Sequence, residues 1–191
     1  MGLFLSNIDR YVNLTPDEQK TVMSLTETAH YKAKTILLKN GEICKTSYFV
    51  TTGILRSYSI DEKGLEHVMS FACANWFIAD MYSFLSGRPG NQFIEVNEDA
   101  EVLEISKDNQ ERMYIEVPKM ERFFRIIVEN SLVASQQRLM DNLSFTAEAR
   151  YDKFLNKFGD LAHRVPQKQI ASYLGVTPEF FSAMKARMLK R

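Results

Sequence analysis

The chain has 191 residues, of which 45% are apolar and 25% charged, and its 24 basic residues balance its 24 acidic ones. This composition is that of an ordinary globular protein, long enough for one full core and a small second domain, and it excludes a disordered chain. No apolar run approaches the roughly 18 residues that a membrane helix needs. The start, MGLFLSNIDR, lacks the pattern of a signal peptide. We therefore expect a cytoplasmic protein without a membrane anchor.

The N-terminal segment carries a helix-start signal at Thr15, Pro16 and Glu18. A threonine followed three positions later by glutamate is a capping box, in which each side chain accepts a hydrogen bond from the other residue's backbone N–H. Proline suits the first helical position. The pattern predicts a helix over residues 16–28, preceded by a shorter helical turn over residues 8–12.

Residues 30–105 show a different pattern, in which short β-branched and aromatic runs alternate with turn signals such as Asn40-Gly41. The runs are TILL, SYFVTT, ILRSYSI, HVMSFA, FIEV and VLEI. Short strands at regular intervals predict a small antiparallel barrel or jelly roll. Residues 80–86, DMYSFLS, lack strand alternation, so we expect a short helix inserted between strands there.

Two further helices are predicted after the strands, one capped by Ser106 and one opened by Pro118 and extending over residues 118–142. The second carries two apolar stripes, and two apolar faces need two partners. One stripe can cover the roll while the other meets its copy in a second subunit. The alternative is a helix buried wholly within one subunit. The residues expected at the dimer interface are Phe124, Val128, Ser131, Leu132, Ser135 and Leu139.

Residues 165–191 predict two short helices joined by a tight turn, after two helices over residues 146–158 and 159–163. Gly175 supplies the turn, and Thr177 followed by Pro178 begins the second helix. This spacing matches the helix-turn-helix of DNA-binding proteins, whose second helix enters the major groove, although an ordinary helical hairpin fits the same pattern. The small core between the two helices is assigned to Ile170, Leu174, Val176, Phe181 and Met184.

The distribution of charge favours DNA binding. From Ala147 onward nine basic residues stand against four acidic ones, a net charge of +5, while residues 1–146 carry −5. Cations gather in the hairpin at Lys168, Lys185, Arg187, Lys190 and Arg191, as contacts with DNA phosphates require. The residues expected to contact DNA are Gln167, Lys168, Thr177, Glu179, Ser182, Ala183, Lys185 and Arg187.

A capped N-terminal helix, a roll with an internal short helix, a long apolar helix and a C-terminal helix-turn-helix together resemble the Crp/Fnr family of bacterial transcription regulators. The most specific segments are residues 164–182, RVPQKQIASYLGVTPEFFS, and residues 41–58, GEICKTSYFVTTGILRSY, the latter similar to the opening of the cyclic-nucleotide-binding roll.

The resemblance implies an α+β fold with three parts. Residues 1–117 form an N-terminal double-stranded β-helix, or jelly-roll, sensor domain, residues 118–143 a dimerisation helix, and residues 144–191 a winged helix-turn-helix domain. It also implies a homodimer that binds double-stranded DNA and contacts RNA polymerase.

The sequence departs from this family at the cyclic-nucleotide cassette, whose glutamate holds the ribose and whose arginine holds the phosphate. Ala79 and Asp80 stand where the family has glycine and glutamate, and residues 89–92 contain no arginine. A buried cyclic phosphate needs a fixed cation or several free N–H groups, so we expect no cyclic AMP binding. The nearby polar residues either line a pocket for another effector or close an empty roll: Asp80, Tyr82, Ser83, Arg88 and Gln92.

The recognition helix departs from the family as well. Arginine usually stands at the position of Ala183, where it can grip guanine with two hydrogen bonds worth about 1–3 kcal/mol of discrimination. We therefore expect weak direct readout and a dependence on phosphates and DNA shape. The sequence ends at Arg191, before the strand pair that commonly follows, so wing contacts are expected to be reduced.

Other chemistries find little support in the sequence. Cys44 and Cys73 are too few for a disulfide framework or a four-thiolate iron–sulfur cluster, and His30, His67 and His163 have no ligand spacing, so we expect no metal or cofactor. No nucleophile elbow, phosphate-binding glycine loop or metal-binding histidine pair indicates an enzyme.

The sequence thus predicts a dimeric DNA-binding regulator with an unidentified or absent effector. The alternative is a ligand-binding regulatory module that acts through protein contacts and has a weak or vestigial reading head.

Overall fold

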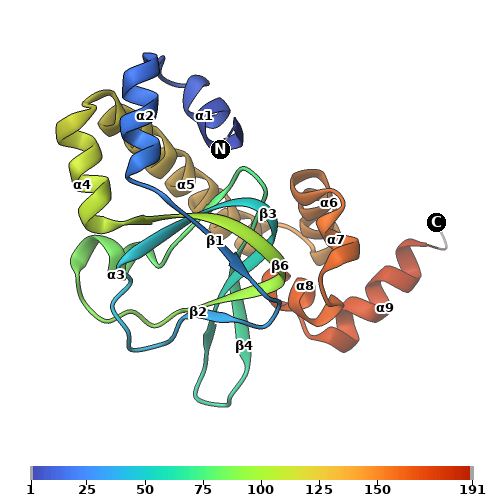
Figure 1. Cartoon of the computed structure of the whole chain (residues 1–191). Helices are drawn as coiled ribbons and strands as arrows, with labels where there is room; N and C mark the ends of the chain where they lie inside the picture. Colours follow the sequence, from blue (N-terminus) through green and yellow to red (C-terminus); the bar gives the residue numbers. More distant parts are fainter. Residues whose placement is uncertain (1, 190–191) are drawn as a thin grey trace.

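The computed structural model describes residues 2–189, so the predictions for Lys190 and Arg191 lie outside the described residues. A rolled sheet lies at the centre of the molecule (Figure 1). Four helices lie on one side of it: α1 (Gly2–Asp9), α2 (Pro16–Ser24), α4 (Lys107–Glu116) and α5 (Lys119–Ser144). Four more form what we term the head: α6 (Ala147–Phe158), α7 (Leu161–Arg164), α8 (Gln167–Leu174) and α9 (Pro178–Met188).

The sheet is antiparallel in every described pairing, with the order β1-β6-β3-β4, while β2 pairs with β6 and β5 with β3. Its strands, which we term the roll, are β1 (Glu27–Tyr31), β2 (Ile36–Leu38), β3 (Thr46–Ile60), β4 (Glu66–Cys73), β5 (Phe77–Ile78) and β6 (Phe93–Ser106). The short helix α3 (Met81–Ser86) follows β5, as predicted. The α+β jelly-roll fold expected from the sequence is confirmed.

Two pairs of predicted strands are single long strands in the structure. SYFVTT and ILRSYSI are both part of β3, and FIEV and VLEI are both part of β6. Gly53 lies between the first two runs with φ +83°, where a Cβ would come 2.4 Å from the carbonyl oxygen of Asp99. The pairing of β3 with β6 shifts register around it. Such bulges let a strand bend without ending, so the apparent break is a bend.

The predicted start of α2 is confirmed, but its predicted end is wrong. Thr15 Oγ1 accepts from the Glu18 N–H at 3.3 Å, and the Thr15 N–H donates to Glu18 Oε2 at 2.7 Å. The helix ends at Ser24, four residues before the expected position, because residues 27–31 pair with β6 as β1. The N-terminal helical turn is also misplaced, since α1 covers Gly2–Asp9 rather than residues 8–12.

The first two turns of α5 are buried within the chain's own core. Phe123 and Phe124 pack edge-to-face on each other, 5.2 Å apart, and both contact the ring of Phe77 in β5. Phe124 is only 6% exposed and also meets Tyr114 of α4. The prediction of Phe124 as a dimer contact is therefore wrong, because β5 and α4 already cover this side chain.

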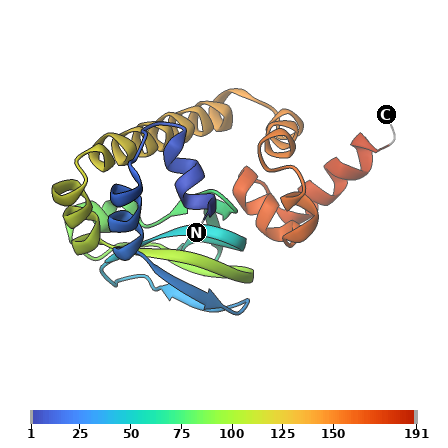
Figure 2. The same cartoon turned by 45° about the horizontal axis from the view of Figure 1, so that its top comes forward.

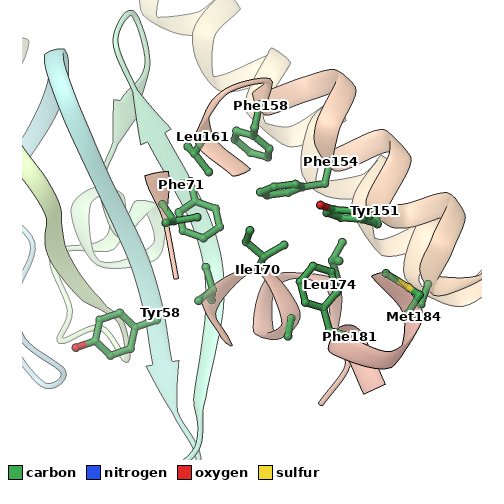
Figure 3. Packing of buried hydrophobic residues seen from close by; sticks show 14 of the residues in the cluster. Tyr58, Phe71, Tyr151, Phe154, Phe158, Leu161, Ile170, Leu174, Phe181 and Met184 are labelled. Carbon is green, nitrogen blue, oxygen red and sulfur yellow. The ribbon is translucent and has the colours of Figure 1, made fainter. Parts of the chain in front are cut away.

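The head shares a hydrophobic core with the roll. Phe71 of β4 contacts Phe154 and Phe158 of α6 and Tyr173 of α8, with ring centroids 5.6–6.2 Å apart. Figure 3 shows Phe154 and Phe158 beside Phe71, with Ile170 and Leu174 below them in the view. Aromatic contacts of this kind add about 0.5–1.5 kcal/mol each beyond the area that they bury. The roll and the head are thus held by one continuous apolar cluster.

Candidate nucleic-acid interface

The two helices of the predicted hairpin form as the sequence indicates. Gly175 has φ +70° and ends α8, and Thr177 Oγ1 accepts from the Phe180 N–H at 3.2 Å to begin α9. The left-handed conformation at Gly175 suits glycine, which lacks a Cβ. Four of the residues assigned to the core of the hairpin are buried: Ile170, Leu174, Phe181 and Met184. The fifth, Val176, is half-buried and packs against the same cluster.

The second helix, α9, presents its other side to solvent. Glu179, Ser182, Ala183 and Arg187 are exposed, as is Thr177 at its start. In both overall views α9 lies at the outer edge of the head, and its C-terminal end points away from the roll (Figures 1 and 2). The side of α9 predicted to face DNA is therefore exposed to solvent and turned away from the roll.

The cations of the hairpin lie in three different environments. Lys168 is exposed at the start of α8, together with Gln167. Lys185 is half-buried, and its Nζ lies 5.7 Å from the ring centroid of Phe181. Arg187 pairs with Glu148 of α6, with a 3.3 Å separation between nitrogen and oxygen. Lys168 is thus presented to solvent, while the other two side chains would have to exchange local contacts to meet a phosphate.

The first helix, α8, is fastened to the roll by hydrogen bonds that the sequence did not reveal. Ser172 Oγ accepts from the Val68 N–H at 2.9 Å and donates to the Glu66 carbonyl at 2.7 Å. Gln169, which is buried, accepts from Asn97 Nδ2 at 2.6 Å. These partners come from β4 and β6, so one side of α8 is held against the roll by hydrogen bonds.

The residues proposed for an effector pocket serve mainly to hold α3 in place. Asp80 and Ser83 are fully buried, and Asp80 Oδ1 accepts from the Ser83 N–H at 3.1 Å as the helix cap. Ser83 Oγ accepts from the Cys44 N–H at 2.8 Å and donates to the Arg88 carbonyl at 2.6 Å. Tyr82 is 60% exposed, Arg88 is exposed and Gln92 is half-buried. None of these five side chains lines the hollow beside β1 and β6 or the hollow between α5, α6 and α8.

The position of Asp80 bears directly on cyclic-nucleotide binding. Its Oδ2 is buried without a hydrogen-bond partner, and a Cβ at Gly90 would come within 2.1 Å of it. The carboxylate therefore occupies the N-terminal end of α3, where backbone N–H groups would otherwise attract an anion. The cation in residues 79–92 is Arg88, which is exposed, so this stretch holds no buried cation to pair with a cyclic phosphate.

The exposed part of α5 carries most of the stripe expected at a dimer interface. Leu132 and Leu139 are 58% and 60% exposed, and Val128 is exposed beside them. Ser131 and Ser135 are exposed on the same helix, joined by a 2.8 Å hydrogen bond from Ser135 Oγ to the Ser131 carbonyl. Further apolar side chains enlarge this surface beyond the predicted set: Val133, Met140 and Leu143.

Membrane and metal chemistry are not evident in the part of the chain that the structure describes. Over residues 2–189, no helix combines the length and apolar character needed to cross a bilayer. Nor do three His, Cys, Asp or Glu side chains of these residues come together as metal ligands.

Comparisons with known proteins agree with this architecture. Residues 28–116 match the family of cyclic nucleotide-binding domains. Electron transport regulator A of Shewanella oneidensis is 23% identical over 165 residues, which are 81% of this chain and 65% of that protein. The chain thus spans about two thirds of the length of such curated relatives. These relatives are regulators by name, which agrees with the expectation that the chain is not an enzyme.

Solved structures share the fold over most of the chain. FixK2 from Bradyrhizobium japonicum has a TM-score of 0.76 at 19% identity and covers 86% of this chain and 85% of its own. A Crp/Fnr-family transcriptional regulator from Eubacterium rectale has a TM-score of 0.69 at 16% identity, covering 90% and 82%. The matched roll, the regulatory relatives and the shared fold agree with the resemblance of this chain to the Crp/Fnr family.

Proposed function

We propose that the chain is a DNA-binding transcription regulator that acts as a homodimer. The observation that carries this proposal is the exposure of the outer side of α9 while Phe181 and Met184 anchor its inner side in the head. A helix held in this way can enter a major groove without unfolding the domain that carries it. Two copies joined through the exposed stripe of α5 would present two such helices to a two-fold-symmetric site.

The chemistry of the exposed residues favours binding through the DNA backbone. Gln167 and Lys168 at the start of α8 and the Thr177 hydroxyl at the start of α9 can meet phosphates. Glu179 and Ser182 are the polar groups placed to reach base edges, with Glu179 able to accept from cytosine. Ala183 contributes no hydrogen bond. Specificity is therefore expected to depend strongly on DNA shape.

We propose further that the roll does not bind cyclic AMP. Residues 89–92 supply no arginine for the phosphate, and Arg88, the nearest cation, is exposed. Contact with RNA polymerase stays a prediction drawn from the family resemblance.

DNA selection tests this function. The protein would be incubated with a random duplex pool, and the affinity for selected and random duplexes compared by fluorescence anisotropy at several salt concentrations. We expect a tighter selected site with two related half-sites, and an affinity that falls steeply with salt. Equal affinity for both duplexes at every salt concentration would refute specific regulation.

A charge-reversal variant separates this function from the alternative of a module that acts through protein contacts. Lys168→Glu together with Arg187→Glu should abolish measurable DNA binding, whereas Lys20→Glu on α2, an exposed position far from the head, should not. If the double variant still regulates its target genes in cells, the module that acts through protein contacts is favoured.

A further inference from the structure

A cavity of about 310 Å³ lies where α5, α6 and α8 meet; we term it the hinge cavity. Its volume is at the lower end of the range for small-molecule sites, roughly 300–1,000 Å³. Its charged lining consists of four cations and one carboxylate: Arg138, Arg150, Lys153, Lys157 and Asp141. No residue of α9 lines it. The hinge cavity is therefore separate from the proposed groove-reading surface.

The cations of the hinge cavity are incompletely paired. Lys153 pairs with Asp141 at 2.6 Å. Arg138 donates only to backbone carbonyls, and Arg150 donates to the Asn142 carbonyl at 3.1 Å. Within residues 2–189, no carboxylate forms an ion pair with either arginine. In both arginines Nε is buried without an acceptor. Four cations thus share one hollow with a single carboxylate, and of the four it is Lys153 that pairs with that carboxylate.

The excess of positive charge in the hinge cavity favours an anionic ligand. Burial lowers the pKa of the Arg138 guanidinium. Loss of hydration, and then the charge of Arg138, lowers the pKa of Lys157. The only carboxylate of the lining is already held by Lys153 and by Gln137 Nε2. A doubly charged anion would therefore relieve repulsion that the chain's own residues leave in place.

We propose that the hinge cavity binds the phosphate group of a small phosphorylated molecule. A guanidinium group can donate two hydrogen bonds to one phosphate, and Arg150 brings such a group to the lining. Lys157, whose Nζ lies 5.1 Å from the ring centroids of Trp76 and Phe158, can turn from these rings to add a second positive charge. Phe154 and Tyr173, which also line the hinge cavity, offer apolar faces to the rest of the molecule. Because the lining comes from both α5 and the head, the bound phosphate would fix the head relative to the long helix.

Titration calorimetry on the full chain tests the site, with inorganic pyrophosphate and AMP as separate probes. The first represents free phosphates and the second phosphate esters. We expect saturable binding of one probe molecule per chain. Arg150→Gln and Lys157→Gln should each weaken binding at least tenfold. Lys168→Gln, which removes an exposed cation of α8 outside the hinge cavity, should leave binding unchanged.

Two results would overturn the site. One is the absence of binding by both probes at millimolar concentration. The other is an equal loss in all three variants, which would show diffuse attraction to a cationic surface. Circular dichroism checks folding. Lys157→Gln decides the question if Arg150→Gln unfolds the chain, because the Lys157 ammonium contacts the Trp76 and Phe158 rings and forms no hydrogen bond or ion pair within residues 2–189.

The binding of phosphate does not depend on DNA binding, but its regulatory effect rests on the proposed function. If the chain binds pyrophosphate but no specific DNA, the proposed regulatory function is refuted and the phosphate site in the hinge cavity is supported. DNA binding that Arg150→Gln weakens, with neither probe bound, would assign these cations to the DNA backbone and refute the site.

Discussion

The guanidinium of Arg138 lies over the ring of Tyr173, with 4.1 Å between the guanidinium carbon and the ring centroid. From α5 it also donates to the Val68 carbonyl and the Tyr173 carbonyl, each at 3.0 Å, and to the Met69 carbonyl. One side chain therefore joins the long helix, the roll and the head. A cation stacked on an aromatic ring with limited access to water contributes up to about 2 kcal/mol.

Replacing Arg138 with leucine should loosen the head. Arg138→Leu leaves three carbonyl groups without their donor, and we expect the free energy of unfolding to fall by about 2–4 kcal/mol. Hydrogen exchange should quicken in β4 and α8. Arg125→Leu is the matched control, since Arg125 lies on the same helix, is exposed and pairs with Glu129 one turn away. Similar losses in both variants would contradict the role assigned to Arg138.

A charge in the exposed stripe of α5 should separate the subunits. Leu132→Glu places two carboxylates in an apolar interface, and we expect the dimer dissociation constant to rise at least a hundredfold, about 2.7 kcal/mol. Sedimentation velocity over a concentration series measures this change. Asn130→Glu, at an exposed polar position on the opposite side of the same helix, should have a much smaller effect. A wild-type chain that stays monomeric at high concentration would refute the interface itself.

An arginine on α9 should sharpen sequence readout. Ala183→Arg adds a guanidinium on the exposed side of the helix, and we expect preference for guanine at one position of each half-site, worth about 1–3 kcal/mol. DNA selection with the variant measures it. Asn156→Arg adds the same charge to an exposed position of α6 and should raise affinity for all sequences alike. Unchanged base preference in Ala183→Arg would show that α9 docks in another orientation.

Acid should weaken the junction between α5 and α6. The pKa of Asp141 lies below its ordinary value of 3.8, first because Lys153 Nζ donates to it at 2.6 Å and then because Gln137 does at 2.9 Å. A carboxyl whose pKa is lowered by folding stabilises the folded state above its unfolded pKa, and this contribution is lost as pH falls through the folded value.

Urea unfolding between pH 6 and pH 3 measures this effect. Asp141→Asn should lower the free energy of unfolding at pH 6 and reduce its further fall toward pH 3. Asp152→Asn changes an exposed carboxyl on α6 and serves as the control. Parallel pH curves for wild type and Asp141→Asn would contradict the assignment.

Signals that act between close neighbours in sequence predicted the local structure well. Thr15, Ser106 and Thr177 each accept a hydrogen bond from the N–H three residues later, as their helix-start patterns indicated. The turn at Gly175 and the apolar core of the hairpin depend on similarly short spacings. Such features are set by side chains within one helical turn, so a single sequence suffices to find them.

Contacts between distant segments could not be predicted in the same way. Ser172 and Val68 are 104 residues apart, and nothing near either residue shows that they meet. The prediction that Phe124 lies at a dimer interface was wrong for a related reason. The periodicity of α5 marks which side chains share a stripe, but it does not show where along the helix β5 and α4 stop covering that stripe.

The aromatic cluster around Phe71 has a thermodynamic consequence for the whole molecule. Pulling the head off β4 would expose Phe71, Phe154 and Phe158 to water, at a cost of about 1.5–3 kcal/mol for each ring. A chain built in this way is expected to lose its tertiary structure in a single calorimetric transition, with equal van't Hoff and calorimetric enthalpies. The roll and the head are then expected to unfold together as one cooperative unit.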